Sequence, residues 1–169
     1  MTEEKLLTLL KKNNIPFVLI GGTALTLYGS TRVTIDTDIA VKTLDVDRII
    51  SLFYDLKFKM VIGVDKNHLP EFASNKKEAK DFSHHSDWGF LKFMTKELEI
   101  DVLYDIPVPF MHLVNNAVSR EYLGIDIDVA CLDHLKLMKE NSIKNRDDDE
   151  KRKLDEMDLK FINKKRKPL

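Results

Sequence analysis

The chain has 169 residues, 43% of them hydrophobic and 33% charged, which is the composition of a globular protein and excludes an intrinsically disordered one. Its formal net charge of -1 excludes a strongly basic protein that binds nucleic acid through an overall positive field. The one cysteine excludes an internal disulfide framework and fits a reducing compartment. No apolar run approaches the about 20 residues of a membrane span, and no secretory signal peptide is present, so we expect a cytoplasmic protein without a membrane partner.

The first third of the chain alternates between helices and strands. Thr2 is the expected N-cap of a first helix, in which leucines recur at helical spacing until Pro16. A short apolar run at residues 17–20 then predicts a buried strand, which a pair of glycines ends. The next predicted elements are a short helix at 23–28, a strand at 33–41, and a helix that Asp45 or Asp47 caps.

The rest of the chain continues this alternation around a central hairpin. A strand at residues 59–64 is followed by a polar, lysine-rich stretch at 65–87, for which we expect a loop with at most a short helix. Two strands at 89–94 and 98–103 are joined by a three-residue turn. The remaining predicted elements are a helix that includes Val118, a strand at 125–130, a helix capped by Asp133, and a last helix with an apolar stripe of Leu154, Met157, Phe161 and Ile162.

Strands and helices that intermix around a central hairpin predict an α+β (α/β-like) domain, in which helices flank a mixed sheet. The length of 169 residues suits one domain with a single sizeable core. We therefore expect one domain over residues 1–169, with its core at about 15–130 and a helical carboxyl-terminal part at about 131–165.

A pair of glycines lies where the strand at 17–20 gives way to the next helix. Because they lack a Cβ, Gly21 and Gly22 allow the backbone to pass close to a ligand. The free N–H groups and the positive dipole end of the following helix favour phosphate at this position. The alternative interpretation is a tight turn without a ligand, and a Gly-Gly pair by itself does not decide between the two.

Asp36 and Asp38 are two residues apart on a predicted strand, so their side chains face the same way. Aspartate is depleted in strands, and two carboxylates on one face repel each other unless a cation lies between them. Hard oxygen ligands of this kind suit Mg²⁺ or Mn²⁺ better than zinc. The alternative is a solvent-facing edge strand that carries two incidental acids.

The glycines and the aspartates together form a longer pattern, in which Ile-Gly-Gly at residues 20–22 is separated by 13 residues from Asp-Thr-Asp-Ile at 36–39. This pattern resembles the signature of the polymerase β nucleotidyltransferase superfamily, although a threonine stands where that family usually has an apolar residue. A closer resemblance is to stand-alone bacterial and archaeal nucleotidyltransferase-like proteins, some of which belong to toxin–antitoxin or abortive-infection systems. The residues that match their first motif are Gly21, Gly22, Ala24, Tyr28, Gly29, Arg32, Thr34, Asp36 and Asp38.

The superfamily also has a third carboxylate on a neighbouring strand, which helps to hold the catalytic metal or acts as base for the attacking hydroxyl. Asp101 matches this carboxylate, since it lies between Ile100 and Val102 on the second strand of the predicted hairpin. Asp126 and Asp128 also alternate on a strand, but no Gly-Gly turn and helix precede them. We interpret these two acids as the solvated face of an edge strand.

The last two predicted helices loosely resemble the family's carboxyl-terminal motifs. The matching residues are Asp133, Leu135, Lys136 and Lys139 on the first of these helices and Arg152, Asp155 and Asp158 on the second. Lys139 is the residue we expect to contact a triphosphate, because a lysine ammonium is a good point charge for phosphate. Asp155 and Asp158 could bridge to Arg152 or Lys139; the alternative, which we favour, is a charged outer face of the helix.

The resemblance implies an enzyme that transfers a nucleoside monophosphate from a nucleoside triphosphate to a hydroxyl and releases pyrophosphate. Asp36, Asp38 and Asp101 would be both the catalytic residues and the ligands of Mg²⁺ or Mn²⁺. The expected nucleotide-binding residues are Gly21, Gly22, Thr23, Arg32, Thr34 and Lys139. The acceptor, which is a protein, a tRNA or a small molecule, stays open. The alternative function is a binding module of the same fold, with weak or no catalysis, that pairs with a toxin or antitoxin partner.

Overall fold

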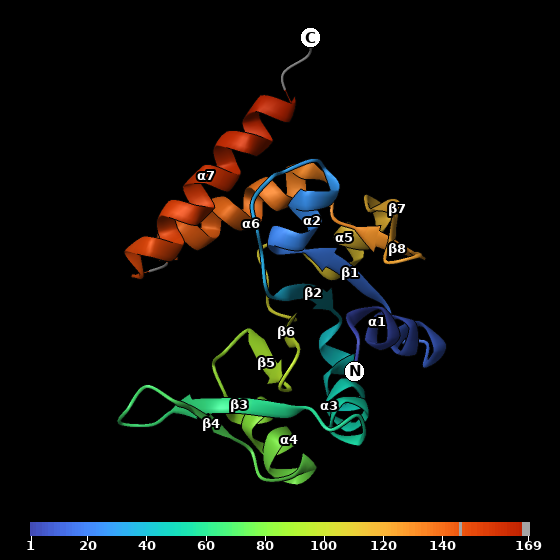
Figure 1. The fold of residues 1–169 in the computed structure, drawn as a ribbon, viewed down its shortest axis with the longest axis vertical. Coiled ribbons are helices and arrows are strands. Elements are labelled where there is room, and N and C mark those ends of the chain that lie inside the picture. The colour runs from blue at the N-terminus through green and yellow to red at the C-terminus, as the bar shows by residue number, and fades with distance from the viewer. Residues whose placement is uncertain (146, 167–169) are drawn as a thin grey trace.

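The computed structural model describes residues 1–145 and 147–166, and its centre is a mixed β-sheet flanked by helices (Figure 1). Within these residues eight strands form the sheet, in the spatial order β4-β3-β5-β6-β2-β1-β8-β7. The strands are β1 (Phe17–Ile20), β2 (Thr37–Val41), β3 (Lys59–Val64), β4 (Pro70–Phe72), β5 (Phe90–Met94), β6 (Glu99–Leu103), β7 (Val118–Tyr122) and β8 (Ile125–Val129). β2 and β6 are parallel, as are β1 and β8, while the other neighbours are antiparallel. The predicted α+β class with a mixed sheet is confirmed.

The helices of the described residues pack around this sheet. They are α1 (Glu3–Lys12), α2 (Gly21–Leu27), the 3₁₀ turn η1 (Thr43–Asp45), α3 (Val46–Asp55), α4 (Lys76–His85), α5 (Phe110–Asn115), α6 (Leu132–Asn145) and α7 (Asp149–Arg166). α2 packs on β1 and β2, α3 packs on α4 and β3, and α6 packs along α7. Figure 1 shows the α6–α7 pair at the opposite end of the molecule from α3 and α4. In the described part of the chain no helix combines the length and the apolar character that crossing a membrane requires.

One face of the central strands is buried and apolar. Ile100 and Val102 of β6 are fully buried, and Ile39 of β2 is the partner of Val102 in the parallel register. On β5, Phe93 packs edge-on against Phe53 of α3, with 4.7 Å between the ring centroids. Because side chains alternate between the two faces of a strand, the intervening residues of β2 and β6 point to the opposite face. That opposite face carries the polar site described below.

The amino-terminal elements agree with the sequence expectation. Thr2 Oγ1 accepts a hydrogen bond from the N–H of Lys5 at 3.3 Å and thereby caps α1. The helix buries Leu6, Leu7 and Leu10, and β1 is buried along its whole length. The strand at 59–64 and the hairpin formed by β5 and β6 are also confirmed.

The strand predicted at 33–41 is shorter than expected, since β2 begins one residue after Asp36. The hydroxyls of Thr23 and Thr34 both donate to the main-chain carbonyl of Asp36, at 3.1 and 3.3 Å. Such side-chain hydrogen bonds compete with the ladder of a sheet. Val33 and Ile35 are each 85% exposed, so the segment before β2 is a loop.

The expectation of a loop at residues 65–87 is wrong, because the segment contains β4 and the ten-residue helix α4. Asn75 caps α4 by accepting hydrogen bonds from the N–H groups of Lys77 and Glu78, at 3.0 and 3.1 Å. The Glu78 carboxylate in turn accepts from the N–H of Ser74 at 2.7 Å. The arrangement resembles a capping box, except that Glu78 bonds to the residue before the N-cap and not to the N-cap itself.

The helix expected to include Val118 ends earlier, and Val118 begins β7. β7 pairs antiparallel with β8 through a tight turn in which Leu123 and Gly124 have φ values of 53° and 78°. Positive φ at both central positions suits the twist of a hairpin. Because β7 takes the edge of the sheet, β8 is internal, and the expectation of an edge strand is wrong. Asp126 and Asp128 are nevertheless solvent-exposed, as predicted.

Two acids expected as helix caps act differently. Asp45 occupies the N-cap position of α3, but its side chain makes no capping hydrogen bond and pairs with Arg48 at 2.6 Å. Asp133 lies in the first turn of α6, inside the helix, and forms an ion pair with Arg166 of α7. Both acids still lie at the helix end where negative charge is favourable.

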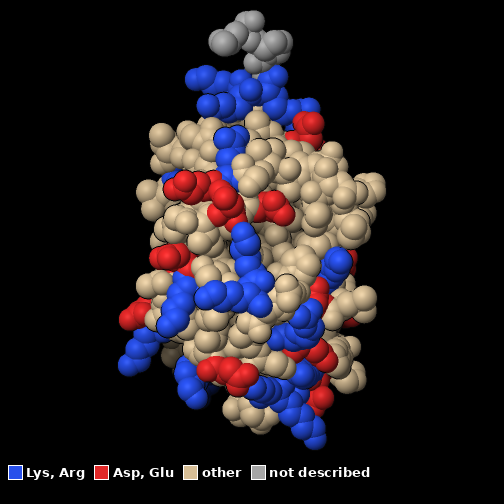
Figure 2. Space-filling model, turned by 90° about the vertical axis from the view of Figure 1, so that its right-hand side faces the viewer, with Lys and Arg blue, Asp and Glu red and all other residues tan. Residues whose placement is uncertain are grey.

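The charged surface is mixed. Figure 2 shows acidic and basic side chains interspersed on one face of the molecule, with basic side chains gathered at the carboxyl end of α7. The last turn of that helix contains Lys164, Lys165 and Arg166. This face therefore offers a local basic patch and not an overall positive field.

Candidate functional site

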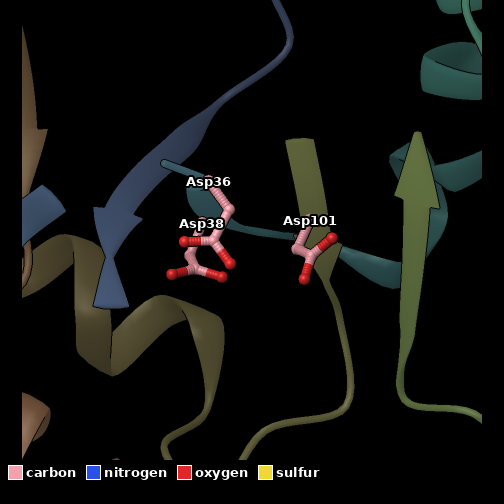
Figure 3. Close-up of side chains that lie close together, drawn as sticks. All are labelled: Asp36, Asp38 and Asp101. Atoms are coloured by element: carbon pink, nitrogen blue, oxygen red, sulfur yellow. The ribbon is translucent and has the colours of Figure 1, made fainter. Parts of the chain in front are cut away.

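Three aspartates meet where β2 and β6 run side by side. In the parallel register Asp38 of β2 is the partner of Asp101 of β6, and Asp36 immediately precedes β2. One carboxylate oxygen from each of the three residues lies within 4.8 Å of those of the other two. Figure 3 shows the carboxylates of Asp36 and Asp38 next to each other, with Asp101 beside them on the neighbouring strand. The fold thus brings together the three acids that the sequence analysis singled out.

The protonation of this cluster is controlled by burial and by mutual repulsion. The pKa of Asp38 is raised to about 7, chiefly by burial and also by the negative charges of Asp36 and Asp101. Burial also raises the pKa of Asp101, an effect that the neighbouring Lys92 opposes. The cluster is therefore short of positive charge at neutral pH, which is the condition that a divalent cation relieves.

Lys92 is a member of the site that the sequence analysis did not identify. It lies on β5 directly opposite Asp101, and its Nζ atom is 3.0 Å from Asp101 Oδ1 and 3.3 Å from a carboxylate oxygen of Glu99. Asp101 Oδ1 is buried, and the Lys92 ammonium is its ion-pair partner. In the observed register Met94 pairs with Glu99, which places Lys92 opposite Asp101. The three-residue turn expected at 95–97 would have paired residue 92 with residue 100, so the predicted hairpin is off by one residue and did not identify Lys92.

Gly21 is required by the position of Asp38. Its φ is 67°, in the left-handed region, and a Cβ at this residue would lie 1.8 Å from Asp38 Oδ2. A side chain at position 21 would therefore occupy the space of the carboxylate itself. The presence of glycine at position 21 is thus explained by the structure, independently of any phosphate contact.

Gly22 lies against the loop that precedes β2. A Cβ at Gly22 would be 2.9 Å from the Thr34 hydroxyl and 3.6 Å from Arg32 Cζ, so the loop packs directly on the first turn of α2. A hollow of about 270 Å³ opens here, and the residues lining it include Thr23, Arg32, Thr34 and Asp36. Four of the residues predicted for nucleotide binding or metal binding therefore share one surface.

The two predicted nucleotide-binding threonines hold Asp36 in place. Thr34 Oγ1 donates to Asp36 Oδ1 at 2.9 Å, and Thr23 Oγ1 donates to the Asp36 carbonyl at 3.1 Å. Thr23 is only 4% exposed. In this structure their role is to orient an acid of the cluster.

Lys139 of α6 and Arg32 converge on two buried acids of α7. Lys139 Nζ lies 2.7 Å from Asp155 Oδ1 and 2.8 Å from Asp158 Oδ2, and Arg32 Nη1 donates to the same Asp158 oxygen. The hydroxyl of Ser142 donates to Asp155 Oδ2 at 2.7 Å. Lys139 is also close enough to Asp38 to lower the pKa of that carboxyl, so this network adjoins the acid cluster.

The expectation that Asp155 and Asp158 lie on an outer face of the last helix is wrong. They are 3% and 1% exposed, whereas Leu154 and Met157, expected on the apolar stripe, are 39% and 58% exposed. Ile162 is fully buried, as predicted. The helix is rotated relative to the expectation because two acids, paired with cations from elsewhere in the chain, take the buried positions.

The bridges predicted for these acids are confirmed in part. Lys139 is a partner of both, but Arg152, the alternative cation, pairs with Asp149 one turn earlier on the same helix. The second cation comes instead from Arg32, 126 residues away along the chain. Among the other residues that matched the carboxyl-terminal motifs, Lys136 lies 3.7 Å from Glu140 of the same helix.

Comparison with known proteins places this geometry in a structural class. No protein-family model and no curated protein match the sequence. The structure of ANT(2'')-Ia in complex with adenylyl-2''-tobramycin is similar with a TM-score of 0.59 and 10% identity, over 95% of this chain and 85% of that one. The lincosamide antibiotic adenylyltransferase LnuA with lincomycin bound has a TM-score of 0.57 and 14% identity, over 96% and 97% of the two chains.

A third similar structure is an antigenic nucleotidyltransferase-like protein from Paracoccidioides brasiliensis, with a TM-score of 0.54 and 14% identity over 93% of this chain and 71% of that one. Likeness at such identities establishes the arrangement of elements and leaves substrates undetermined. The chain has the nucleotidyltransferase fold.

Proposed function

We propose that this protein is a metal-dependent nucleotidyltransferase, which transfers a nucleoside monophosphate from a nucleoside triphosphate to a hydroxyl group and releases pyrophosphate. The observation that carries the proposal is the group of three aspartates, whose carboxylate oxygens lie within 4.8 Å of one another in a nucleotidyltransferase fold. Carboxylates this close repel one another when all are charged, so the arrangement calls for a cation.

Asp36, Asp38 and Asp101 fit a divalent cation such as Mg²⁺ or Mn²⁺. They offer hard oxygen ligands, which these ions prefer. The raised pKa of Asp38, to which the negative charges of Asp36 and Asp101 contribute, indicates unmet demand for positive charge. When bound there, such a cation polarises the phosphoryl group and orients the attacking and leaving oxygens.

We assign Asp101 as the base for the acceptor hydroxyl. Burial raises the pKa of its carboxyl, which strengthens it as a proton acceptor. The carboxylate takes the hydroxyl proton while the hydroxyl oxygen forms a bond to the α-phosphorus. The bond from that phosphorus to the bridging oxygen breaks, and pyrophosphate leaves with the electron pair. Lys92, 3.0 Å from Asp101, limits how far the pKa rises.

The triphosphate is bound by the residues that border the acid cluster. The two cations, Arg32 and Lys139, neutralise the negative charge of the phosphates. The glycines let the Asp38 carboxylate and the loop before β2 approach the first turn of α2, where we place the phosphates, and the threonines fix Asp36. The proposed nucleotide-binding residues are Gly21, Gly22, Thr23, Arg32, Thr34 and Lys139.

The acceptor is a protein, a tRNA or a small molecule. Two of the similar structures are those of an adenylated-tobramycin complex and a lincosamide adenylyltransferase. These likenesses make small hydroxyl-bearing molecules the first acceptors to test, followed by tRNA and protein.

The test measures transfer of label from each of the four α-labelled nucleoside triphosphates, with Mg²⁺ or Mn²⁺, to aminoglycosides, lincosamides, tRNA and cell lysate. We expect one triphosphate to label an acceptor. Asp101→Asn should lower transfer by at least about a hundredfold with near-normal triphosphate affinity, because the base acts in the transition state and not in the ground-state complex.

Asp128→Asn is the matched control. It makes the same change in the other Asp-x-Asp strand, where the side chain is solvent-exposed, and should transfer label as the wild type does. Equal labelling by wild type and Asp101→Asn contradicts the assignment of the base. A wild-type protein that labels nothing, and whose melting temperature no metal or triphosphate raises, contradicts the proposed function itself.

One observation favours the alternative of a binding module that pairs with a toxin or antitoxin partner. Arg32 and Lys139 are both engaged by Asp158 in this structure, so the cations expected for a triphosphate are already neutralised. A complex with a second protein, together with the absence of any triphosphate effect on stability, is the result that this alternative requires.

A further inference from the structure

Asp158 stands at a junction that links three parts of the chain. Its Oδ2 atom accepts from Arg32 Nη1 in the loop before β2 and lies 2.8 Å from Lys139 Nζ on α6. The Asp158 side chain itself is only 1% exposed. One buried carboxylate oxygen therefore holds two cations from separate parts of the chain, the loop before β2 and α6.

The network pairs charges of opposite sign. Asp155 and Asp158 contribute two negative charges, and Lys139 and Arg32 contribute two positive ones. A buried carboxylate is stable only when paired and hydrogen-bonded, and Asp158 meets this condition through both cations. The acids lie behind the cations, since they are more deeply buried than Lys139 and Arg32, which are 13% and 23% exposed.

Both cations lie near the acid cluster. Arg32 Cζ lies 3.6 Å from the place where a Cβ of Gly22 would be, so its guanidinium rests against the first turn of α2. Arg32 Nε is buried and has no hydrogen-bond partner in the described structure, which leaves one donor of the guanidinium unused. Lys139 acts electrostatically on Asp38 from the other side. The two cations thus flank the place where the triphosphate is proposed to bind.

We infer that Asp158 is a positioning residue for the triphosphate: it holds Arg32 and Lys139 from behind, in fixed places beside the aspartate cluster, before nucleotide arrives. The inference rests on the proposed function. Two preset cations bind a triphosphate more tightly than two free side chains, because less side-chain entropy is lost on binding. Asp158 itself contacts the cations and not the nucleotide.

The sign of the effect of Asp158→Asn separates positioning from simple charge. Asparagine keeps the size of the side chain but removes a negative charge near a polyanion. If Asp158 acted only through its charge, its removal would tighten triphosphate binding. If it positions the cations, its removal lets them move apart, and binding weakens. We expect the Kd for the triphosphate, measured by calorimetry with each of the four nucleotides and Mg²⁺, to rise at least about tenfold.

A second measurement excludes general damage to the fold. The Kd for Mn²⁺ alone depends on Asp36, Asp38 and Asp101, and we expect Asp158→Asn to change it by less than about twofold. Loss of Mn²⁺ binding together with loss of triphosphate binding would mean a structural role and overturn the inference. Unchanged or tighter triphosphate binding would also overturn it.

Asp158→Glu serves if Asp158→Asn does not fold. Glutamate keeps the charge and both ion pairs but moves the carboxylate by one methylene, so a positioning role predicts a roughly threefold rise in the triphosphate Kd with an unchanged Kd for Mn²⁺. Wild-type triphosphate affinity in that variant overturns the inference. A wild-type protein that binds Mn²⁺ but no triphosphate overturns the proposed function and the inference together. Wild-type triphosphate binding with no loss in the variants overturns the inference alone.

Discussion

The molecule contains two buried clusters of charge that differ in how they are balanced. The cluster of Asp36, Asp38 and Asp101 gathers like charges, with Lys92 as a neighbouring cation. The network of α6 and α7 pairs two acids with two cations within hydrogen-bond distance. The first is a site that calls for an external cation, whereas the acids of the second already have cations of the chain beside them. The comparison teaches that a cluster of acids indicates a cation site where the matching positive charge is missing.

Neutralising one acid in each cluster is the most direct test of this difference between the two clusters. Asp38→Asn should lower nucleotide transfer by about a thousandfold, because it removes a ligand of the proposed cation at the centre of the site. The same change should raise the melting temperature of the metal-free protein at pH 8, since it removes repulsion. Asp155→Asn should lower that melting temperature, because it leaves Lys139 less well paired. Melting temperatures that move in the same direction would contradict the distinction between the two clusters.

Removing a cation from the network of α6 and α7 should lower the stability of the protein, because the buried acids lose a partner. Lys139→Met keeps the length and apolar stem of the side chain but leaves Asp155 and Asp158 with one cation fewer. Breaking a buried ion pair on one side destabilises a protein by about 3 kcal/mol. We expect a loss of that size in urea unfolding. Lys136→Met, on the same helix and paired more loosely with Glu140 at 3.7 Å, is the control and should change the stability by less than about 1 kcal/mol.

The smallest expected effect is on the pH dependence of stability without metal. The pKa of Asp38 in the folded state is about 7, above its ordinary value of 3.8, so the folded protein holds this proton more tightly than the unfolded chain does. The stability contributed by the proton is fully present below about pH 4 and is lost as the pH rises towards 7. The free energy of unfolding in EDTA should therefore fall by roughly 1 kcal/mol per pH unit between pH 5 and 7.

A substitution and an added metal test whether this pH dependence belongs to Asp38. Asp38→Asn should remove most of the pH slope, because asparagine does not titrate in this range, while Asp101, whose pKa burial also raises, leaves a smaller slope. Saturating Mg²⁺ should stabilise the wild type more at pH 8 than at pH 5, since metal binding needs the charged carboxylate. An undiminished slope in Asp38→Asn would assign the titration to other groups.

The acid cluster was predictable because it follows local rules. The period of two along a strand places Asp38 apart from its buried neighbours. Asp101 was identified through the family resemblance, since the hairpin pattern pairs its strand with β5 and does not predict the parallel pairing of β6 with β2. Asp36 was identified for a partly wrong reason, since it precedes β2 and is oriented by Thr23 and Thr34 and not by strand alternation.

The network of α7 was not predictable by the same rules. Hydrophobic periodicity assigns Leu154 and Met157 to the buried face, but the buried positions belong to Asp155 and Asp158. Acids are buried only when cations pair with them, and the sequence does not reveal that the fold brings Arg32 into contact with α7. Local rules also missed β7, whose turn uses Leu-Gly where Asn-Gly would have been a clear hairpin signal.

The contact between Arg32 and Asp158 can form only late in the synthesis of the chain. It spans 126 positions of the chain. A ribosome that adds roughly 5–20 residues per second makes Asp158 about 6 to 25 seconds after Arg32. Asp101 and Lys139 are made within that interval, and the carboxylate that fixes the two cations is made after both. Assembly of the proposed triphosphate site is therefore deferred until α7 has been synthesised and has packed along α6.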